Sequence, residues 1–276
     1  MPDRLTPDEQ RRDCLAQWDG AAGGWAKAQA WMRALTAGVS HWLVDALELQ
    51  PGQRVLELAA GAGETGFLAA ELIAPGGTLI CSDQSQAMID VARDRAAELG
   101  LQNVEFRLIN AESIDLPVAS VDAVICRWGY MLMVDPQAAL SETRRVLGTG
   151  GRVAMACWAE LAANPWFALP REVLVAHGLL DPPDPGAPGP FALSDPDHLR
   201  ELLEQAGFTE IEIDAIDLDF DAGNFEAWWE MQIDISPWGA TVRAAGSELR
   251  AELAAEVAER LSSEVTGRTL VAVASA

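Results

Sequence analysis

Residues 55–66, VLELAAGAGETG, constrain the fold of this chain more than any other stretch. An apolar run ends on the acid Glu57, and Gly61 and Gly63 follow shortly after. Glycine adopts positive φ angles and has no Cβ, so a ligand can come close to the backbone of such a turn. A helix that begins there directs free N–H groups and its positive end at the ligand. The stretch predicts a buried strand, a tight turn and a helix around a nucleotide-like molecule.

Composition limits the classes of function. A chain of 276 residues with 50% hydrophobic residues suits one large domain with a substantial core. The formal net charge of −23 repels phosphate backbones and anionic lipid heads, which argues against nucleic-acid binding. No apolar run approaches the roughly 20 residues that cross a bilayer, and residues 1–13 are too charged for a signal peptide. We therefore expect a cytoplasmic protein without membrane insertion.

The cysteines predict neither disulfides nor a metal site. Cys81, Cys126 and Cys157 lie in apolar runs, Cys14 is isolated, and no C-x-x-C spacing occurs. Thiols in such runs are typically buried and reduced. We expect no bound metal.

Helical and strand patterns alternate along the chain. Thr6-Pro7-Asp8-Glu9 is a helix start, and helical periodicity runs to about residue 49, with an expected interruption at residues 20–24. This segment carries four of the ten tryptophans. Strands are expected at about 54–58, 78–82, 104–108, 121–126, 152–158, 208–218 and 269–274.

This order predicts an α/β fold: a Rossmann-like, seven-stranded, mostly parallel sheet with helices on both faces, plus helical N-terminal and inserted cap segments. We expect a single domain, since no linker divides the chain. Its parts are a helical cap (1–50), a cofactor-binding core (51–158), a lid-like insertion (159–195) and the C-terminal part of the sheet with a helical insertion (196–276).

The glycine turn alone leaves the ligand open. Gly61-x-Gly63-x-x-Gly66 has the spacing of the dinucleotide fingerprint, and Asp83 ends the second strand where an acid binds ribose. The carboxylate of Glu57 discriminates between ligands, because it repels a pyrophosphate and attracts an ammonium or sulfonium group. It favours S-adenosylmethionine over NAD.

Several motifs together resemble the class I S-adenosylmethionine-dependent methyltransferases, and most closely the ubiquinone/menaquinone-biosynthesis C-methyltransferase group (methyltransferase type 11 domain). The first motif of the family matches residues 57–63, with Ala59 in place of its first glycine. Asp83 matches the acid that ends strand two. Residues 110–117, 121–124 and 145–151 resemble the adenine-side segment, the fourth strand and the turn before the fifth.

The resemblance implies a cofactor site with S-adenosylhomocysteine as product. Glu57, Ala59, Gly61 and Gly63 would face the methionine moiety, and Asp83 the ribose. The remaining implied contacts are Gln84 and Met88 beside ribose and adenine, Asn110, Ala111 and Glu112 on the adenine side, the backbone carbonyl of Arg127 on the ammonium, and Trp128 in an aromatic wall.

Methyl transfer from a sulfonium needs mostly alignment and exclusion of water. A hydroxyl or acidic-carbon acceptor would also need a base, and His177, in the lid-like insertion, is the candidate catalytic residue. The expected acceptor is a small apolar or aromatic molecule, quinone-like or a secondary metabolite, methylated on oxygen or carbon. Arsenic methylation is disfavoured because the cysteines do not cluster.

Two other functions stay open at this stage. One is an NAD-dependent oxidoreductase, and the other is a protein that binds S-adenosylmethionine without methyl transfer. The sequence leaves the acceptor and the oligomeric state, a homodimer included, undetermined.

Overall fold

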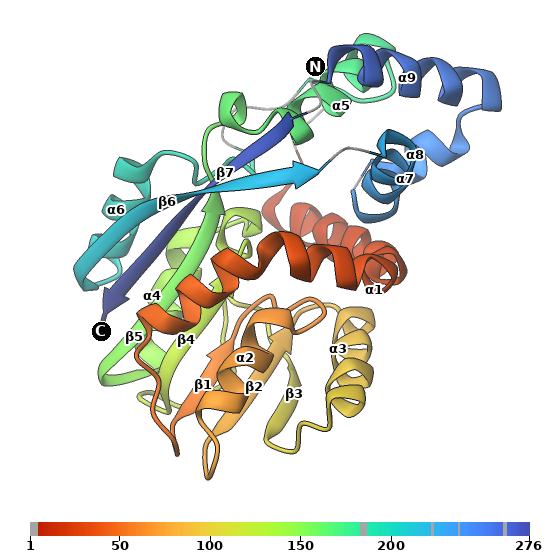
Figure 1. The fold of residues 1–276 in the computed structure, drawn as a ribbon. Helices are drawn as coiled ribbons and strands as arrows, with labels where there is room; N and C mark the ends of the chain where they lie inside the picture. Colours follow the sequence, from red (N-terminus) through yellow and green to blue (C-terminus); the bar gives the residue numbers. More distant parts are fainter. Residues whose placement is uncertain (1–4, 183–186, 222–223, 237, 262–263) are drawn as a thin grey trace.

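A seven-stranded sheet organises the protein (Figure 1). The computed structural model describes residues 5–182, 187–221, 224–236, 238–261 and 264–276. The strand order is β3-β2-β1-β4-β5-β7-β6. The strands are β1 (Arg54–Glu57), β2 (Thr78–Asp83), β3 (Val104–Leu108), β4 (Val121–Arg127), β5 (Leu147–Trp158), β6 (Thr209–Asp221) and β7 (Glu264–Ser275).

The sheet is mostly parallel, as the alternating pattern predicted. Strands β1 to β5 pair in parallel, and β7 runs antiparallel between β5 and β6. Strands β1, β2 and β4 are almost entirely buried, which is typical of a parallel sheet covered on both faces. The mainly parallel, helix-covered sheet confirms the predicted fold class.

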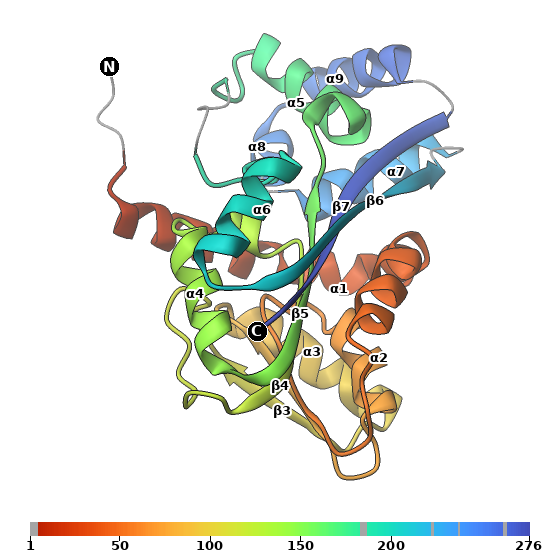
Figure 2. The same cartoon turned by 90° about the vertical axis from the view of Figure 1, so that its left-hand side faces the viewer.

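Helices cover both faces of this sheet (Figure 2). On one face lie α1 (Pro7–Ala46), α2 (Glu64–Leu72) and α3 (Gln86–Leu99), and on the other lie α4 (Pro136–Val146) and α6 (Pro196–Gln205). The remaining helices are α5 (Pro165–Ala176), α7 (Phe225–Ile235), α8 (Gly239–Ala244), α9 (Ser247–Arg260) and the short 3₁₀ turns η1 (Tyr130–Leu132) and η2 (Leu161–Ala163). In Figure 1, α5, α7, α8 and α9 stand beyond the parallel core, alongside the long ends of β6 and β7.

Helix α1 begins where the sequence predicted, with a complete capping box between Thr6 and Glu9. The expected interruption at residues 20–24 is wrong, because α1 continues unbroken through these glycines. Packing gives the reason at Gly24, where a Cβ would overlap the backbone of Asp234 in α7. Glycine lets the two helix backbones approach closely, and tertiary contact outweighs its low helix propensity.

Two strands are longer than their apolar patterns. β5 begins at Leu147 rather than near residue 152, and β7 begins at Glu264 rather than near residue 269. The antiparallel ladder between β6 and β7 extends from Thr209↔Ser275 to Asp221↔Glu264, so backbone pairing continues past the buried side chains. Of the lid-like segment 159–195, residues 183–186 lie outside the described residues.

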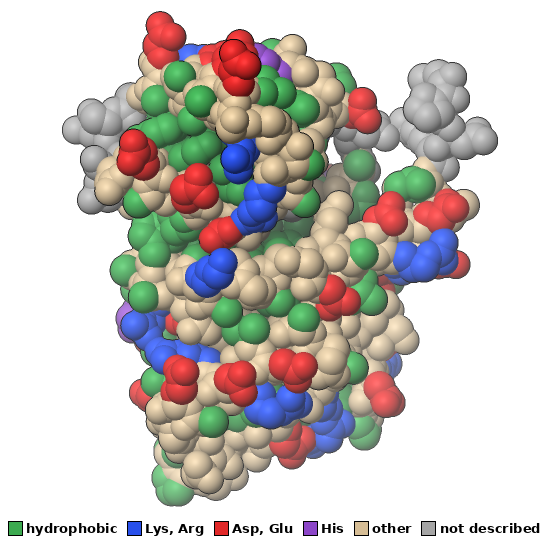
Figure 3. Space-filling model, turned by 90° about the vertical axis from the view of Figure 1, so that its right-hand side faces the viewer, with side chains coloured by type: hydrophobic (Ala, Val, Ile, Leu, Met, Phe, Trp, Pro, Cys, Tyr) green, Lys and Arg blue, Asp and Glu red, His purple; other side chains and the backbone are tan. Residues whose placement is uncertain are grey.

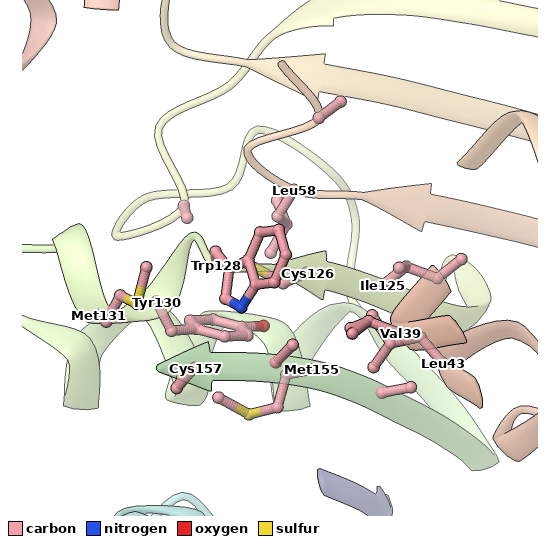
Figure 4. Packing of buried hydrophobic residues seen from close by; sticks show 14 of the residues in the cluster. Val39, Leu43, Leu58, Ile125, Cys126, Trp128, Tyr130, Met131, Met155 and Cys157 are labelled. Atoms are coloured by element: carbon pink, nitrogen blue, oxygen red, sulfur yellow. The ribbon is translucent and has the colours of Figure 1, made fainter. Parts of the chain in front are cut away.

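The core fills the space on both sides of the central strands. Figure 4 shows Trp128, Tyr130 and Met131 packed beside β4 and β5. The hydroxyl of Tyr130, which is fully buried, lies 2.6 Å from Thr143 Oγ1 in α4. These buried side chains anchor the segment that follows β4, and they fix the direction in which the chain leaves the sheet.

Candidate functional site

A cavity of about 490 Å³ lies at the carboxyl ends of β1, β2 and β4. The strand order changes direction between β1 and β4, and ligands of open α/β sheets bind at such a switch point. Helix α1, the start of α5 and residues 187–190 complete its wall. Of the predicted cofactor residues, those that line it are Glu57, Ala59, Gly61, Asp83, Gln84, Met88, Ala111, Arg127 and Trp128.

Asp83, at the end of β2, holds the glycine turn that follows β1. Its Oδ2 accepts the backbone N–H of Gly61 at 3.0 Å, and its Oδ1 accepts that of Ser85 at 2.9 Å. Burial raises the pKa of Asp83, while the bonds from Ser85 and Gly61 act in the opposite direction. Gly61 and Gly63 have φ of +54° and +83°, and Gly63 caps α2 without a side-chain bond. The turn therefore exposes backbone to the cavity, as the motif predicted.

Glu57 is the most unusual acid of the site. It is 2% exposed, its Oε1 accepts the N–H of Gly66 at 2.8 Å, and its Oε2 has no hydrogen-bond partner among the described residues. Burial raises its pKa from 4.5 to about 7. A buried acid with an unpartnered oxygen on a cavity indicates a ligand that supplies the missing donor or positive charge.

Three of the predicted cofactor residues lie outside the cavity lining, two in the adenine-side segment and one in the glycine turn. Ala111 lines the cavity, but Asn110, Glu112 and Gly63 do not belong to its lining. The Oδ1 of Asn110 accepts the N–H of Glu112 at 2.9 Å. The carboxylate of Glu112 accepts the N–H of Val134 at 2.9 Å and two bonds from Arg11. Glu112 therefore ties α1 to this segment, a contact between residues 101 positions apart that the sequence pattern did not reveal.

Arg127 and Trp128 follow the buried part of β4. The Nη1 of Arg127 donates hydrogen bonds to Thr36 and Ser40 of α1, and its guanidinium carbon lies 5.1 Å from the centre of the Trp128 ring. Trp128 has a φ of +59°, which is rare for a bulky residue. Its indole stacks on Trp158 at 4.3 Å and donates to Thr269 at 2.9 Å, and these contacts hold the unusual backbone in place.

Aromatic and other apolar side chains form the rest of the wall. The sequence pointed to Trp128 in this wall, but not to Trp158. Members from three elements, α1, β5 and α5, face the cavity: Trp18, Trp25, Trp31, Trp158, Trp166 and Phe167. Trp42 and the Trp228-Trp229 pair do not line it. On the face drawn in Figure 3, hydrophobic side chains gather where the surface is hollowed between the upper and lower parts of the molecule.

His177 is not brought to the cavity. It ends α5, and its Nε2 lies 2.9 Å from a carboxylate oxygen of Glu256 in α9. The Nδ1 of His41 lies 2.8 Å from the carbonyl of Ala37, and His198 is exposed on α6. No histidine occurs among the described residues that line the cavity.

The cavity residues fit S-adenosylmethionine, which the sequence resemblance implies. Four carboxylic acids line it (Asp13, Glu57, Glu64 and Asp83), against Arg127 as the one basic residue among the described lining. The resulting negative electrostatic potential favours a ligand with a sulfonium and an ammonium group and disfavours a pyrophosphate. Bare backbone at Gly61 and the unpartnered Glu57 oxygen supply further complementary features.

The described residues contain neither a membrane-spanning helix nor a cluster of metal ligands. None of their helices combines the length and the apolar character needed to span a membrane. The same residues contain no group of three or more His, Cys, Asp or Glu side chains arranged to hold a metal ion.

Comparison with known proteins finds similarity to methyltransferases. A family model described as "Methyltransferase domain" matches residues 49–178. The arsenite methyltransferase of Halobacterium salinarum is 34% identical over 200 residues, covering 71% of this chain and 47% of that protein. The ubiquinone/menaquinone biosynthesis C-methyltransferase of Xanthomonas oryzae pv. oryzae is 34% identical over 128 residues, covering 46% and 50%.

Two further matches extend over more of the chain. The nocamycin O-methyltransferase of Saccharothrix syringae is 28% identical and covers 85% of this chain and 86% of that protein. The crystal structure of the YcgJ protein of Bacillus subtilis superposes with a TM-score of 0.60 at 18% identity, covering 86% of this chain and 97% of its own, which supports the fold. The chain spans about half the length of the first curated relatives that it matches.

Proposed function

Because the chain belongs to the class I S-adenosylmethionine-dependent methyltransferases, we propose that it transfers the methyl group of this cofactor to oxygen or carbon of a small apolar or aromatic acceptor. The observation that carries the proposal is one cavity with two kinds of wall. The acids and glycines at the strand ends form its cofactor end, and indole and phenyl rings form much of the remainder.

This arrangement supplies what the reaction needs. Bound S-adenosylmethionine provides an activated methyl group on its sulfonium, and the acceptor supplies the electron pair and loses a proton. The rings of Trp158, Trp166 and Phe167 would hold a flat acceptor and exclude water, and their faces tolerate the nearby positive charge. Alignment of the two reactants then accounts for much of the catalysis.

The cysteines bear on the choice of acceptor. Arsenite chemistry calls for several thiols around one arsenic atom, and one relative is an arsenite methyltransferase. Here Cys81, Cys126 and Cys157 are buried in β2, β4 and β5, and Cys14 alone among the four lines the cavity. We therefore favour an organic acceptor, in agreement with the carbon and oxygen methylation named for the other two relatives.

Calorimetric titration of the full chain with S-adenosylmethionine, S-adenosylhomocysteine and NADH tests the cofactor. We expect binding of both adenosyl ligands and none of NADH. Binding of NADH alone would reverse the choice between methyltransferase and oxidoreductase.

An acceptor panel of phenols, hydroquinones and β-dicarbonyl compounds, followed by mass spectrometry for a gain of one methyl group, tests the transfer. Phe167→Leu serves as the acceptor-side variant, because Phe167 lies in the aromatic wall. It should change KM for the acceptor and leave S-adenosylhomocysteine affinity unaltered. Tight cofactor binding without turnover on any acceptor would favour a binding protein instead.

A further inference from the structure

Glu57 and Arg127 leave the same face of the sheet at neighbouring strand ends. In the parallel pair β1–β4, Glu57 is opposite Ile125, and Arg127 lies two residues beyond Ile125. Side chains alternate between faces along a strand, so Ile125 and Arg127 point to one side, which is also the side of Glu57. The contacts agree, because Glu57 bonds to Gly66 of α2 and Arg127 bonds to Thr36 and Ser40 of α1, two helices that cover this face.

Arg127 has donors to spare. A guanidinium carries five N–H donors, and both hydrogen bonds from Arg127 to α1 come from Nη1. In the part of the chain that the structure describes, Nε and Nη2 form no hydrogen bond. Burial lowers the pKa of the guanidinium, while Glu57 and Glu64 act to raise it. The side chain lines the cavity, so its remaining donors are available to a ligand there.

We propose that Arg127 binds the α-carboxylate of the methionine end of the cofactor while Glu57 binds the α-ammonium. This inference rests on the proposed function, and it assigns to the side chain of Arg127 a role that the sequence resemblance did not imply. An amino acid presents one negative and one positive group on a single carbon, and the Glu57–Arg127 pair is the matching arrangement of opposite charges. Charge-assisted bonds from a planar guanidinium to a carboxylate are strong and directional.

Helix α1 holds Arg127 in place for this contact. Thr36 and Ser40, which accept its Nη1 bonds, are 1% and 4% exposed, and Ser40 Oγ lies 3.1 Å from Thr65 Oγ1 at the start of α2. Thr36 and Ser40 are thus positioning residues that act through Arg127. Loss of the Thr36 hydroxyl should weaken carboxylate recognition, because Arg127 loses one of the two acceptors that orient its guanidinium.

Two ligands that differ only in the carboxylate test the assignment: S-adenosylmethionine and its decarboxylated form. Affinities of both are measured by calorimetry for the wild type, Arg127→Met, Arg127→Lys and Thr36→Val. Arg127→Met should weaken S-adenosylmethionine binding about tenfold or more and leave the decarboxylated ligand unchanged or bound more tightly, since the loss of one charge-assisted bond is on this scale. Arg127→Lys should fall between, because it keeps the charge but loses the planar fork.

The outcomes are distinct. An equal loss for both ligands would show a purely structural Arg127 and overturn the inference, and so would unchanged binding of both. If Arg127→Met does not fold, the ligand preferences of Arg127→Lys and Thr36→Val decide in the same way. A wild type that binds neither adenosyl ligand would overturn the proposed function itself, and the inference with it.

Discussion

The carboxylate of Glu57, at the end of β1, accepts the backbone N–H of Gly66, in the first turn of α2, at 2.8 Å. A Cβ at position 66 would overlap Oε2 of the same carboxylate. The third glycine of the GxGxxG spacing therefore leaves the room that the Glu57 carboxylate occupies between the strand end and the helix. Gly66 thereby preserves the orientation of Glu57, an acid that faces the cavity.

Gly66→Ala should displace the Glu57 carboxylate and weaken S-adenosylmethionine binding by about 1–3 kcal/mol, the scale for loss of a charged hydrogen bond. Calorimetry measures the effect. In a Glu57→Ala background, where the overlapping atoms are gone, the added Gly66→Ala change should cost little further affinity. Additive losses in this double-mutant cycle would contradict the steric coupling.

Glu57→Gln should stabilise the ligand-free protein at high pH. Burial raises the pKa of Glu57 from 4.5 to about 7. The ionised acid therefore costs no stability below pH 4.5, destabilises the fold increasingly between pH 4.5 and 7, and has its full cost above pH 7. At pH 8 we expect the variant to have a free energy of unfolding about 1–3 kcal/mol above that of the wild type. Denaturant unfolding at pH 4.5 and pH 8 measures it. A difference that does not grow with pH would show that Glu57 is not the titrating group.

Asp83→Ala should weaken S-adenosylmethionine binding by roughly 1.5–3 kcal/mol, because it removes a charged partner from the proposed ribose contact. The carboxylate also holds the N–H groups of Gly61 and Ser85, so the variant should lose order in the turn. Asp83→Asn is the control, since its amide oxygen retains one of these bonds. Unaltered affinity in a folded Asp83→Ala variant would rule out the ribose role.

Neighbouring glycines of α1 should respond to alanine in opposite directions. At Gly23 a Cβ would meet nothing within 4 Å, so Gly23→Ala should stabilise the protein by about 1 kcal/mol through helix propensity. At Gly24 the Cβ would overlap the backbone of Asp234, so Gly24→Ala should destabilise it by about 1–3 kcal/mol. Thermal and denaturant unfolding of the pair measure this. A change in the free energy of unfolding with the same sign for both variants would contradict the close approach of α1 and α7.

His177→Gln should leave methyl transfer unchanged, because His177 contacts Glu256 and lies outside the cavity lining. Its side chain is partly exposed, so the stability should change by less than about 1 kcal/mol. Steady-state kinetics on any acceptor found in the panel, with Phe167→Leu measured in parallel, provides the comparison. A large fall in kcat for His177→Gln alone would restore it as a candidate base.

Much of this fold follows from local sequence patterns. Apolar runs, helix caps and glycine turns specify β1, the glycine turn and α2, and an acid at position 57 favours a cationic ligand over a pyrophosphate. These features depend on backbone geometry and on neighbours within a few residues, so they can be read from one chain. The motifs then indicated the cofactor and most of the residues at its end of the cavity.

Tertiary structure decided the rest. The sequence could not show that Glu112 pairs with Arg11, that Arg127 reaches Thr36 and Ser40, or that α1 runs unbroken past Gly24. The sequence placed His177 in a lid-like insertion and made it a candidate base. In the folded chain its ring contacts the carboxylate of Glu256 and not the cavity. Such contacts join residues tens of positions apart, and side-chain pairing at that distance depends on how whole helices pack across the sheet.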